Sequence, residues 1–399
     1  MYLKSKKFAA MFLVAIMLLS TATACGKKED KKPSEKTENT ENSKKPETPE
    51  KKEEKIVFKD TIGREITLPK VATKAIADSP NTLRLYSYVM GIDGLIGISP
   101  REVKGSERRP YALAYRDEML KLKHFGGNYS VENFEEVLLA KPDVFFSSYK
   151  ESSAEYDKIQ DKIGAPVVAL DSGTGVVFDP KLYESITIIG KVMGREKRAK
   201  EVVDYMESLK KDLNDRTKDI PEDKKAKVYA GGLAWNGPHG IEGTRENYPL
   251  FDVVNAKNVV TGIGKNGLVE IDKEKILKWN PDFIFIDLAS IDLIQNDYNQ
   301  NKDYYKSLKA FKNGNVYAQL PFVWCNVNVD TAMANAYYVG KIVYPDKFQD
   351  VDPIAKTNEI YKFLVGKPVY DEVAKTDFGG FQKITLEDLD SNKFFKKKK

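Results

Sequence analysis

Short apolar runs and amphipathic stretches alternate along the chain from Ile56 to about Asp377. The runs are rich in β-branched residues, and the stretches between them repeat apolar residues at helical spacing. The runs that we predict to be strands are "KAIAD", "GLIGI", "DVFFSS", "PVVAL", "KVYAGG", "FIFID" and "NVYAQL". Strands that alternate with helices form open α/β sheets, and about 320 residues suit two domains of ordinary size. We therefore expect an α/β fold with two Rossmann-like lobes.

Two segments far apart in the chain share one pattern. "EEVLLAKPD" at 135–143 and "EKILKWNPD" at 274–282 both follow Glu-x-Val/Ile-Leu-x-x-x-Pro-Asp, and an apolar run comes directly after each. In both, a helix is expected to end before the proline, which disfavours a helical conformation in the preceding residue. Because loops from helix to strand favour Pro and Asp, a chance match is the alternative. The shared Glu and apolar spacing favours two related lobes.

A helical segment separates the two copies. Asp179 followed by Pro180 is typical of a helix start, and Gly194 is expected to break that helix. From Glu196 to about Arg216 apolar residues recur at helical spacing, and a helix of that length spans about 30 Å, enough to tie both lobes together. The expected organisation is an N-terminal lobe at 56–178, a linking helical segment at 179–220, a C-terminal lobe at 221–377 and a basic tail at 378–399.

The first residues predict a secreted, anchored protein. Lysines precede an apolar run that is too short to span a bilayer comfortably, and "TATAC" places small residues before Cys25. We interpret 1–25 as a signal peptide whose cysteine resembles a bacterial lipobox and carries a lipid; a retained membrane helix is the alternative. Residues 26–55 contain no large apolar residue and are expected to be a disordered, charged linker. The expected location is the extracytoplasmic face of the cell membrane.

Composition points to no cofactor and no nucleic-acid partner. The formal charge of +5 is spread along the chain. "GIGKNG" at 262–267 matches G-x-G-x-x-G, but no helix is expected at the third glycine, where a dinucleotide site needs one. The chain has two histidines, His124 and His239, and their separation argues against a zinc or manganese site built on several imidazoles. We expect no metal site of the protein's own and no catalysis. His124 is interpreted as structural or exposed, and Cys325 as a buried small hydrophobe.

Several segments, taken in order, resemble one known family. "VFKDTIGREITLP" (57–69), "KAIADSPNTLRLYSYVMGIDGLIGIS" (74–99) and "NFEEVLLAKPDVFFSS" resemble the N-terminal lobe of the siderophore-, haem- and cobalamin-binding proteins of ABC importers. "DKEKILKWNPDFIFID" and "NAYYVGKIVYPDKFQDVD" (335–352) resemble the C-terminal lobe and final helices. The resemblance covers about 56–366. It implies two lobes joined by one rigid helix, a ligand in the cleft and little hinge closure, and we expect a monomer.

The resemblance implies a lipid-anchored solute-binding protein that delivers a metal chelate, a ferric siderophore, haem or corrinoid, to a membrane permease. Molybdate or tungstate is the alternative within the same fold. An extracytoplasmic α/β enzyme and an adhesin or assembly lipoprotein are alternatives from other classes.

Ligands of open α/β sheets bind beyond the carboxyl ends of the strands. The candidate ligand-binding residues, each in a loop after a predicted strand, are Ser79, Asn81, Arg101, Tyr149, Trp235, His239, Arg245 and Trp324. Trp235 is suited to stack on a planar ligand, His239 to contact a chelated metal and Arg245 to pair with an anion. The alternatives are that His239 only caps a strand and that Trp324 belongs to the core. Arg108 and Arg109 are expected to be solvated.

Glu135 and Glu274 open the two copies of the repeat. A two-lobed protein that sits on a two-fold permease needs one equivalent contact on each lobe. The resemblance adds that paired glutamates meet arginines of the membrane subunits, so we predict that these two dock the permease. The alternative is that each carboxylate only favours a first helical turn.

Overall fold

The computed structural model describes residues 55–148, 150, 152–173, 177–264 and 267–395. The expected signal peptide, its expected lipidation site Cys25, the expected linker up to Glu54 and the candidate ligand residue Tyr149 lie outside these ranges. Among the described residues, no helix combines the length and the apolar character that crossing a membrane requires.

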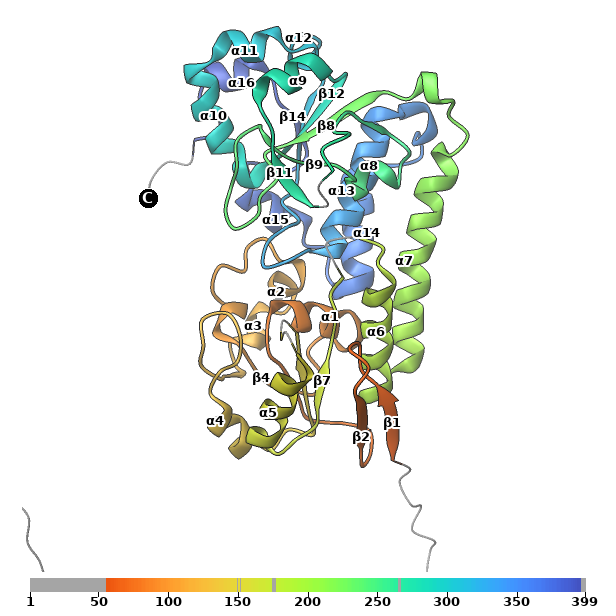
Figure 1. Cartoon of the computed structure of the whole chain (residues 1–399), viewed down its shortest axis with the longest axis vertical. Coiled ribbons are helices and arrows are strands. Elements are labelled where there is room, and N and C mark those ends of the chain that lie inside the picture. Colours follow the sequence, from red (N-terminus) through yellow and green to blue (C-terminus); the bar gives the residue numbers. More distant parts are fainter. Residues whose placement is uncertain (1–54, 149, 151, 174–176, 265–266, 396–399) are drawn as a thin grey trace, which may run out of the picture. The chain divides into compact units, whose positions relative to one another are not determined.

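The N-terminal lobe is built on a parallel sheet with helices on its faces (Figure 1). Its strands lie in the order β5-β4-β3-β6-β7. They are β3 (Ala75–Ala77), β4 (Leu95–Ile98), β5 (Lys123–His124), β6 (Val144–Ser147) and β7 (Val167–Ala169). The hairpin of β1 (Ile56–Lys59) and β2 (Glu65–Leu68) precedes them. The helices are α1 (Pro80–Met90), α2 (Pro110–Ala114), α3 (Arg116–Met119), α4 (Phe134–Ala140) and α5 (Ser153–Ile163).

The C-terminal lobe repeats this plan. Its sheet has the order β10-β8-β12-β13-β14, in which only β14 is antiparallel. The strands are β8 (Lys227–Gly231), β10 (Lys257–Asn258), β12 (Phe283–Asp287), β13 (Val316–Gln319) and β14 (Gln382–Lys383), with a separate hairpin of β9 (Gly243–Arg245) and β11 (Leu268–Glu270). The helices are α8 (Pro249–Asp252), α9 (Lys273–Trp279), α10 (Ile291–Gln300), α11 (Lys302–Ser307), α12 (Lys309–Lys312), α13 (Val329–Val343), α14 (Pro353–Val365), α15 (Tyr370–Thr376) and α16 (Leu386–Asp390).

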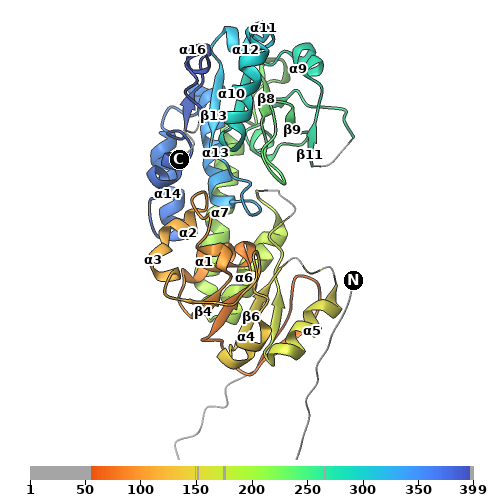
Figure 2. The same ribbon diagram turned by 90° about the vertical axis from the view of Figure 1, so that its left-hand side faces the viewer.

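Two helices connect the lobes, α6 (Pro180–Val192) and the long α7 (Glu196–Thr217). Asp179 caps α6 by accepting a hydrogen bond from the Lys181 amide at 2.9 Å, and Gly194, at φ +65°, separates the two helices. Helix α7 packs against α1 of the N-terminal lobe and against α13 of the C-terminal lobe (Figures 1 and 2). The two Rossmann-like lobes and the long linking helix are therefore confirmed.

The seven apolar runs form strands because alternate residues of each strand are buried on opposite faces of its sheet. In β6, Phe145 packs into a core confined to the N-terminal lobe, whereas Val144 and Phe146 face a larger core. That larger core also contains Val228 and Phe285 of the C-terminal sheet and the buried face of α7. One apolar core therefore runs along the linking helix through both lobes.

The expectation of a basic tail from 378 onwards is wrong for 378–395. Strand β14 pairs with β13, and α16 follows it with Thr385 accepting a hydrogen bond from the Asp388 amide at 3.0 Å. Ile384, Leu389 and Phe394 are buried in the C-terminal core. These apolar residues, spaced among many lysines and acids, complete the sheet edge, so composition alone misjudged the segment.

Candidate functional site

Each sheet reverses its strand order at one point, and the two reversals place the candidate loops. In the N-terminal sheet the chain moves from β3 outward to β4 and β5, then returns to add β6 on the other side of β3. In the C-terminal sheet β8 and β12 have the same relation. Loops that leave neighbouring strands in opposite directions open a crevice at the carboxyl ends, where ligands of such sheets bind.

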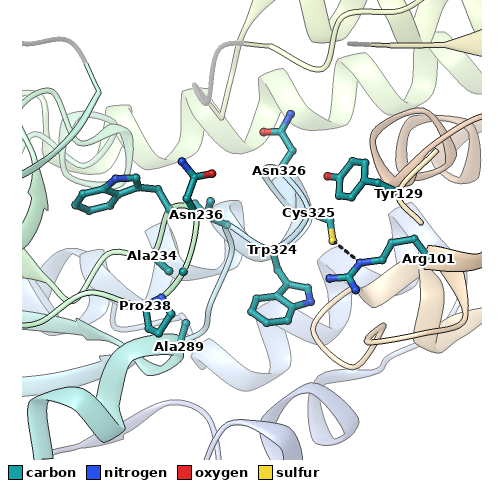
Figure 3. Close-up of a pocket in the computed structure, with 12 residues that line it drawn as sticks. Arg101, Tyr129, Ala234, Asn236, Pro238, Ala289, Trp324, Cys325 and Asn326 are labelled. Atoms are coloured by element: carbon teal, nitrogen blue, oxygen red, sulfur yellow. Dashed lines mark hydrogen bonds between the residues drawn. The ribbon is translucent and has the colours of Figure 1, made fainter. Parts of the chain in front are cut away.

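A cavity of about 500 Å³ occupies the crevice of the C-terminal lobe and reaches the N-terminal lobe (Figure 3). The loop after β8 supplies one wall, the turn before α13 a second, and the N-terminal lobe a third. The lining residues are Ala234, Trp235, Asn236, Gly237, Pro238 and Ala289; Val323, Trp324, Cys325 and Asn326; and Arg101 and Tyr129. The structure thus brings Arg101, Trp235 and Trp324 to one cavity. The sequence analysis predicted that the loops carrying them line one cleft.

The turn at 323–327 is a tight hairpin that projects into this cavity (Figure 3). Val323 and Val327 form an antiparallel bridge, and Cys325 and Asn326 between them have φ of +51° and +66°. Left-handed conformations at residues other than glycine cost on the order of 1–3 kcal/mol each and persist only where the surroundings hold them. The turn is therefore strained at Cys325 and must be held in place by its surroundings.

Arg84 of α1 holds the turn from the opposite lobe. Its side chain is buried and donates hydrogen bonds to the carbonyl oxygens of Cys325 at 3.0 Å and Trp324 at 3.4 Å, and to Asn328 Oδ1 at 3.1 Å. One guanidinium of the N-terminal lobe thus fixes the backbone of the C-terminal turn.

Trp324 lies at the meeting of the lobes rather than in a core. Its indole Nε1 donates to the Gly105 carbonyl oxygen at 3.0 Å, and the Arg108 guanidinium lies 4.6 Å from the centre of its ring. The expectation that Arg108 and Arg109 are solvated is wrong. Arg108 forms an ion pair with Asp377 at 2.6 Å, and Arg109 is fully buried against Glu102 at 2.8 Å. Paired arginines in sequence look like a surface patch, and only the fold shows that both have buried carboxylate partners.

The interpretation of Cys325 as a buried small hydrophobe is also wrong. The thiol is half-buried in the cavity wall, and Arg101 Nε lies 3.4 Å from its sulfur (Figure 3). The local signal for this placement is the Asn326 that follows, since asparagine tolerates the left-handed conformation of a tight turn.

His239 lies behind Trp235 and does not line the cavity. The two rings stack with their centres 3.5 Å apart and an angle of 11° between their planes. Nδ1 lies 2.7 Å from Glu270 Oε1 and Nε2 lies 2.9 Å from the Trp235 carbonyl oxygen. Because both ring nitrogens face oxygen acceptors, neither directs a lone pair toward the cavity. The imidazole is arranged to support the indole.

Arg245 lines a neighbouring cavity of about 240 Å³, together with Tyr248 and Phe322. Burial lowers the pKa of Arg245, and Tyr248 and Asp252 oppose this shift. This cavity shares Val323 and Asn326 with the larger one, so it extends the same cleft.

Ser79 and Asn81 have different places at the start of α1. Ser79 is fully buried, and its hydroxyl lies 3.1 Å from that of Ser148, so it belongs to the structural support of the loops. Asn81 lines a third cavity, also of about 240 Å³, in the crevice of the N-terminal lobe.

Asp287, at the end of β12, is a buried carboxyl group beside the large cavity. Burial raises its pKa to about 7; the hydrogen bond from the Ala289 amide and the charge of Arg108 oppose the rise, and Asp377 adds to it.

Among the described residues, no group of three or more His, Cys, Asp or Glu side chains is placed to hold a metal ion.

In the segment 262–267, of which the structure describes Gly262, Ile263, Gly264 and Gly267, the amides of Gly262 and Gly264 donate to the Glu246 carboxylate at 2.6 and 3.0 Å. Strand β11, and no helix, begins after Gly267. The other histidine, His124, has Nε2 3.3 Å from the Met119 carbonyl oxygen, which agrees with a structural role.

Glu135 and Glu274 occupy equivalent places in the two lobes. Each is exposed in the first turn of a seven-residue helix, α4 or α9, that ends in a left-handed residue. The aspartates that follow, Asp143 and Asp282, both accept hydrogen bonds from backbone amides at the start of the first strand of their sheet, at 2.8 Å (Thr73) and 3.0 Å (Lys227). The sequence repeat is thus a structural repeat.

Known proteins resemble this chain in sequence and in fold. Residues 104–320, more than half of the chain, match the sequence profile of a family described as periplasmic binding protein. YvrC of Bacillus subtilis, an uncharacterized ABC transporter substrate-binding lipoprotein, is 24% identical over 347 residues, or 86% of this chain and 98% of that protein. The molybdate-binding protein MolA of Haemophilus influenzae is 23% identical over 325 residues, or 77% of this chain and 90% of that protein.

The solved structure of MolA bound to molybdate has a TM-score of 0.60 at 21% identity and covers 78% of this chain and 98% of that one. The haem uptake protein IsdE of Staphylococcus aureus is 28% identical over 178 residues, or 42% of this chain and 57% of that protein.

Proposed function

This chain belongs to the periplasmic binding protein family, and we propose that it is the lipid-anchored component of an ABC importer that captures a metal chelate between its lobes. The chelate classes are those of the sequence prediction: a ferric siderophore, haem or a corrinoid. The protein then delivers the chelate to the membrane permease.

The single observation that carries this proposal is the size and lining of the large cavity. A volume of about 500 Å³ is in the range of sites for drug-sized ligands, far above that of one oxyanion. Trp235, Trp324 and Tyr129 supply aromatic surface and Arg101 supplies a cation. Aromatic surface favours the conjugated or alkyl parts of a chelate, and a guanidinium favours its anionic groups.

Molybdate or tungstate remains the second candidate, because two observations favour it. MolA is named as a molybdate-binding protein and aligns with most of this chain. In addition, the small cavity of the N-terminal lobe is bordered by polar side chains. An importer for a free oxyanion would use that cavity rather than the aromatic one.

The absorbance spectrum of the protein purified from its native host tests the choice. Haem, corrinoids and ferric chelates absorb visible light, whereas molybdate and tungstate do not. A visible band that stays with the protein through size-exclusion chromatography and disappears on denaturation is the expected result. A colourless protein that contains molybdenum or tungsten by elemental analysis would replace the chelate by the oxyanion.

The lipid anchor is part of the proposal. It is supported by the sequence around Cys25 and by the lipoprotein YvrC among the relatives. A Cys25→Ser variant is expected in the soluble fraction of cells that retain the wild type on the membrane. Retention of the variant after a high-salt wash would show that the apolar segment itself is the anchor.

A further inference from the structure

We propose that the small cavity of the N-terminal lobe is an anion subsite that binds one oxyanion group through Asn81, Ser172 and Lys150. The group is either a free tetrahedral oxyanion or a carboxylate or phosphate arm of the chelate. The inference deepens the proposed function by placing a negatively charged group in the ligand. Its second form, an anionic arm of the chelate, rests on that proposed function.

The cavity lies at the strand-order reversal of the N-terminal sheet. Asn81 comes from the segment after β3, and Ser148 and Lys150 come from the segment after β6. It has a volume of about 240 Å³, which fits a small group rather than a whole chelate. Asn81 also stands in the first turn of α1, an eleven-residue helix, whose positive end favours an anion.

Asn81 supplies the observation that points to a ligand. The residue is 1% exposed, and within the described ranges its Nδ2 has no hydrogen-bond partner. Arg84 Nη1 lies 3.5 Å from Asn81 Oδ1 and can only donate, so the amide is oriented with its oxygen toward Arg84 and its NH2 group away. A buried N–H donor without an acceptor is costly, which is why nearly all are paired. An acceptor in the cavity would satisfy it.

Two further donors border the same space. Asn326 Nδ2 donates to Ser172 Oγ at 2.8 Å, which leaves the Ser172 hydroxyl proton free to be donated elsewhere. Lys150 adds an ammonium group. The acidic residue of the wall, Asp171, is already paired with Lys181 at 3.2 Å and accepts a hydrogen bond from the Gly173 amide at 2.8 Å. Asn81, Ser172 and Lys150 therefore present three donor groups to the cavity, which match an oxyanion.

Asn326 connects this subsite to the rest of the cleft. It borders the anion subsite, the Arg245 cavity and the large aromatic cavity alike. A ligand whose body lies between Trp235 and Trp324 can therefore pass an arm beside Asn326 and reach Asn81.

The test is calorimetric titration of the full-length protein with sodium molybdate and sodium phosphate, and separately with ferric citrate and haemin. Asn81→Asp keeps the shape of the side chain but replaces the free donor by a carboxylate oxygen, and Ser172→Ala removes a half-exposed hydroxyl without disturbing the core. Asn299→Asp and Ser208→Ala make the same chemical changes on exposed helical positions away from the cleft. Circular dichroism confirms that each variant is folded.

The expected result is that Asn81→Asp lowers the affinity for at least one bound probe tenfold or more and Ser172→Ala lowers it about threefold or more, while both controls match the wild type. Loss of molybdate or phosphate binding identifies a free oxyanion as the source, and loss confined to ferric citrate or haemin identifies an arm. If the wild type binds oxyanions but no chelate, and Asn81→Asp weakens that binding, the subsite stands and the chelate proposal falls. Oxyanion binding that is equal in the wild type and both variants overturns the subsite.

If a chelate binds equally well to the wild type and both variants, and no oxyanion binds, the subsite is overturned while the proposed function stands. Binding of none of the four probes by the wild type overturns the subsite as well.

Discussion

Asp287 is a buried, pH-sensitive carboxyl group behind Ala289 of the cavity wall. Its pKa lies near 7 in the folded protein, against an ordinary value of 3.8, because burial disfavours the charged form. A group whose pKa is raised by folding stabilises the fold fully below its unfolded pKa, and this contribution is lost as the pH rises through the folded value. The contribution of Asp287 is therefore complete near pH 4 and gone above about pH 7.

We predict that Asp287→Asn removes this dependence. The difference in free energy of unfolding between variant and wild type should be near zero at pH 4 and should grow to roughly 3 kcal/mol in favour of the variant at pH 8. Urea titrations at several pH values measure it. Asn keeps the oxygen that accepts from the Ala289 amide, so a difference that is constant with pH would contradict a raised pKa at this residue.

Trp235 and His239 should differ in their effects on ligand affinity. Trp235 borders the cavity, whereas His239 stacks behind it. Trp235→Ala should weaken the tightest-binding of haemin, ferric citrate and cyanocobalamin by about 1–3 kcal/mol, and His239→Ala by about 0.5–1.5 kcal/mol. Trp235→Phe should recover part of the loss. A larger effect of His239→Ala than of Trp235→Ala would show that the imidazole contacts the ligand itself.

The sequence predicted some of these residues and missed others for a physical reason. The apolar pattern shows clearly the strands that precede Arg101, Trp235 and Trp324, and this made the three residues predictable. The buried pairs of Arg108 and Arg109 were missed, because their partners Asp377 and Glu102 are set by the fold and not by spacing. The position of Cys325 in the cavity wall was missed because its turn is held by contacts from the other lobe.

At the scale of elements, the turn at 323–327 and helix α1 depend on each other. The turn has two residues in left-handed conformations, Cys325 and Asn326, and Arg84 supplies donors to its carbonyl oxygens. Apolar strands such as β6 and β12 were predictable from sequence, since a strand that is buried on both faces has a continuous apolar run. The short hairpin of β9 and β11 and the edge strand β14 were not, since their pairing is decided by tertiary contacts.

We predict that Arg84→Met lowers the free energy of unfolding by about 1.5–3 kcal/mol, because buried acceptors lose a charged donor. Hydrogen exchange at the amides of 323–327 should also become faster. Lys200→Met is the control: Lys200 pairs with Asp204 one turn along α7, both side chains are exposed, and such a pair is worth about 0–1 kcal/mol. Equal losses in the two variants would show that Arg84 does not fix the turn.

At the scale of the whole molecule, the repeat gives each lobe one exposed glutamate in an equivalent helix. Exposed leucines lie beside them, Leu138 and Leu139 on α4 and Leu277 on α9. Exposed leucines beside a carboxylate on each lobe suit a protein partner with matching symmetry. This supports the proposal that Glu135 and Glu274 dock the permease, which the sequence analysis reached from the repeat together with the family resemblance.

We predict that the double variant Glu135→Lys, Glu274→Lys abolishes uptake of the transported ligand while ligand affinity and melting temperature stay nearly unchanged. Reversal of an exposed charge disrupts a partner's complementary surface but little within the fold. The control double variant is Asp117→Lys, Asp303→Lys, which also changes one exposed first-turn carboxylate on each lobe. Wild-type uptake by the first pair, or equal loss in both pairs, would place docking elsewhere.

The chain has three tryptophans, and two of them border the large cavity, so its fluorescence reports directly on where a ligand binds. The third, Trp279, lies on α9, partly buried against the C-terminal core. We predict that haemin or a ferric chelate quenches the fluorescence of the wild type and of Trp279→Phe with the same dissociation constant. The same titration of the double variant Trp235→Phe, Trp324→Phe should show little quenching. Quenching that persists in the double variant and vanishes in Trp279→Phe would contradict a chelate site between the lobes.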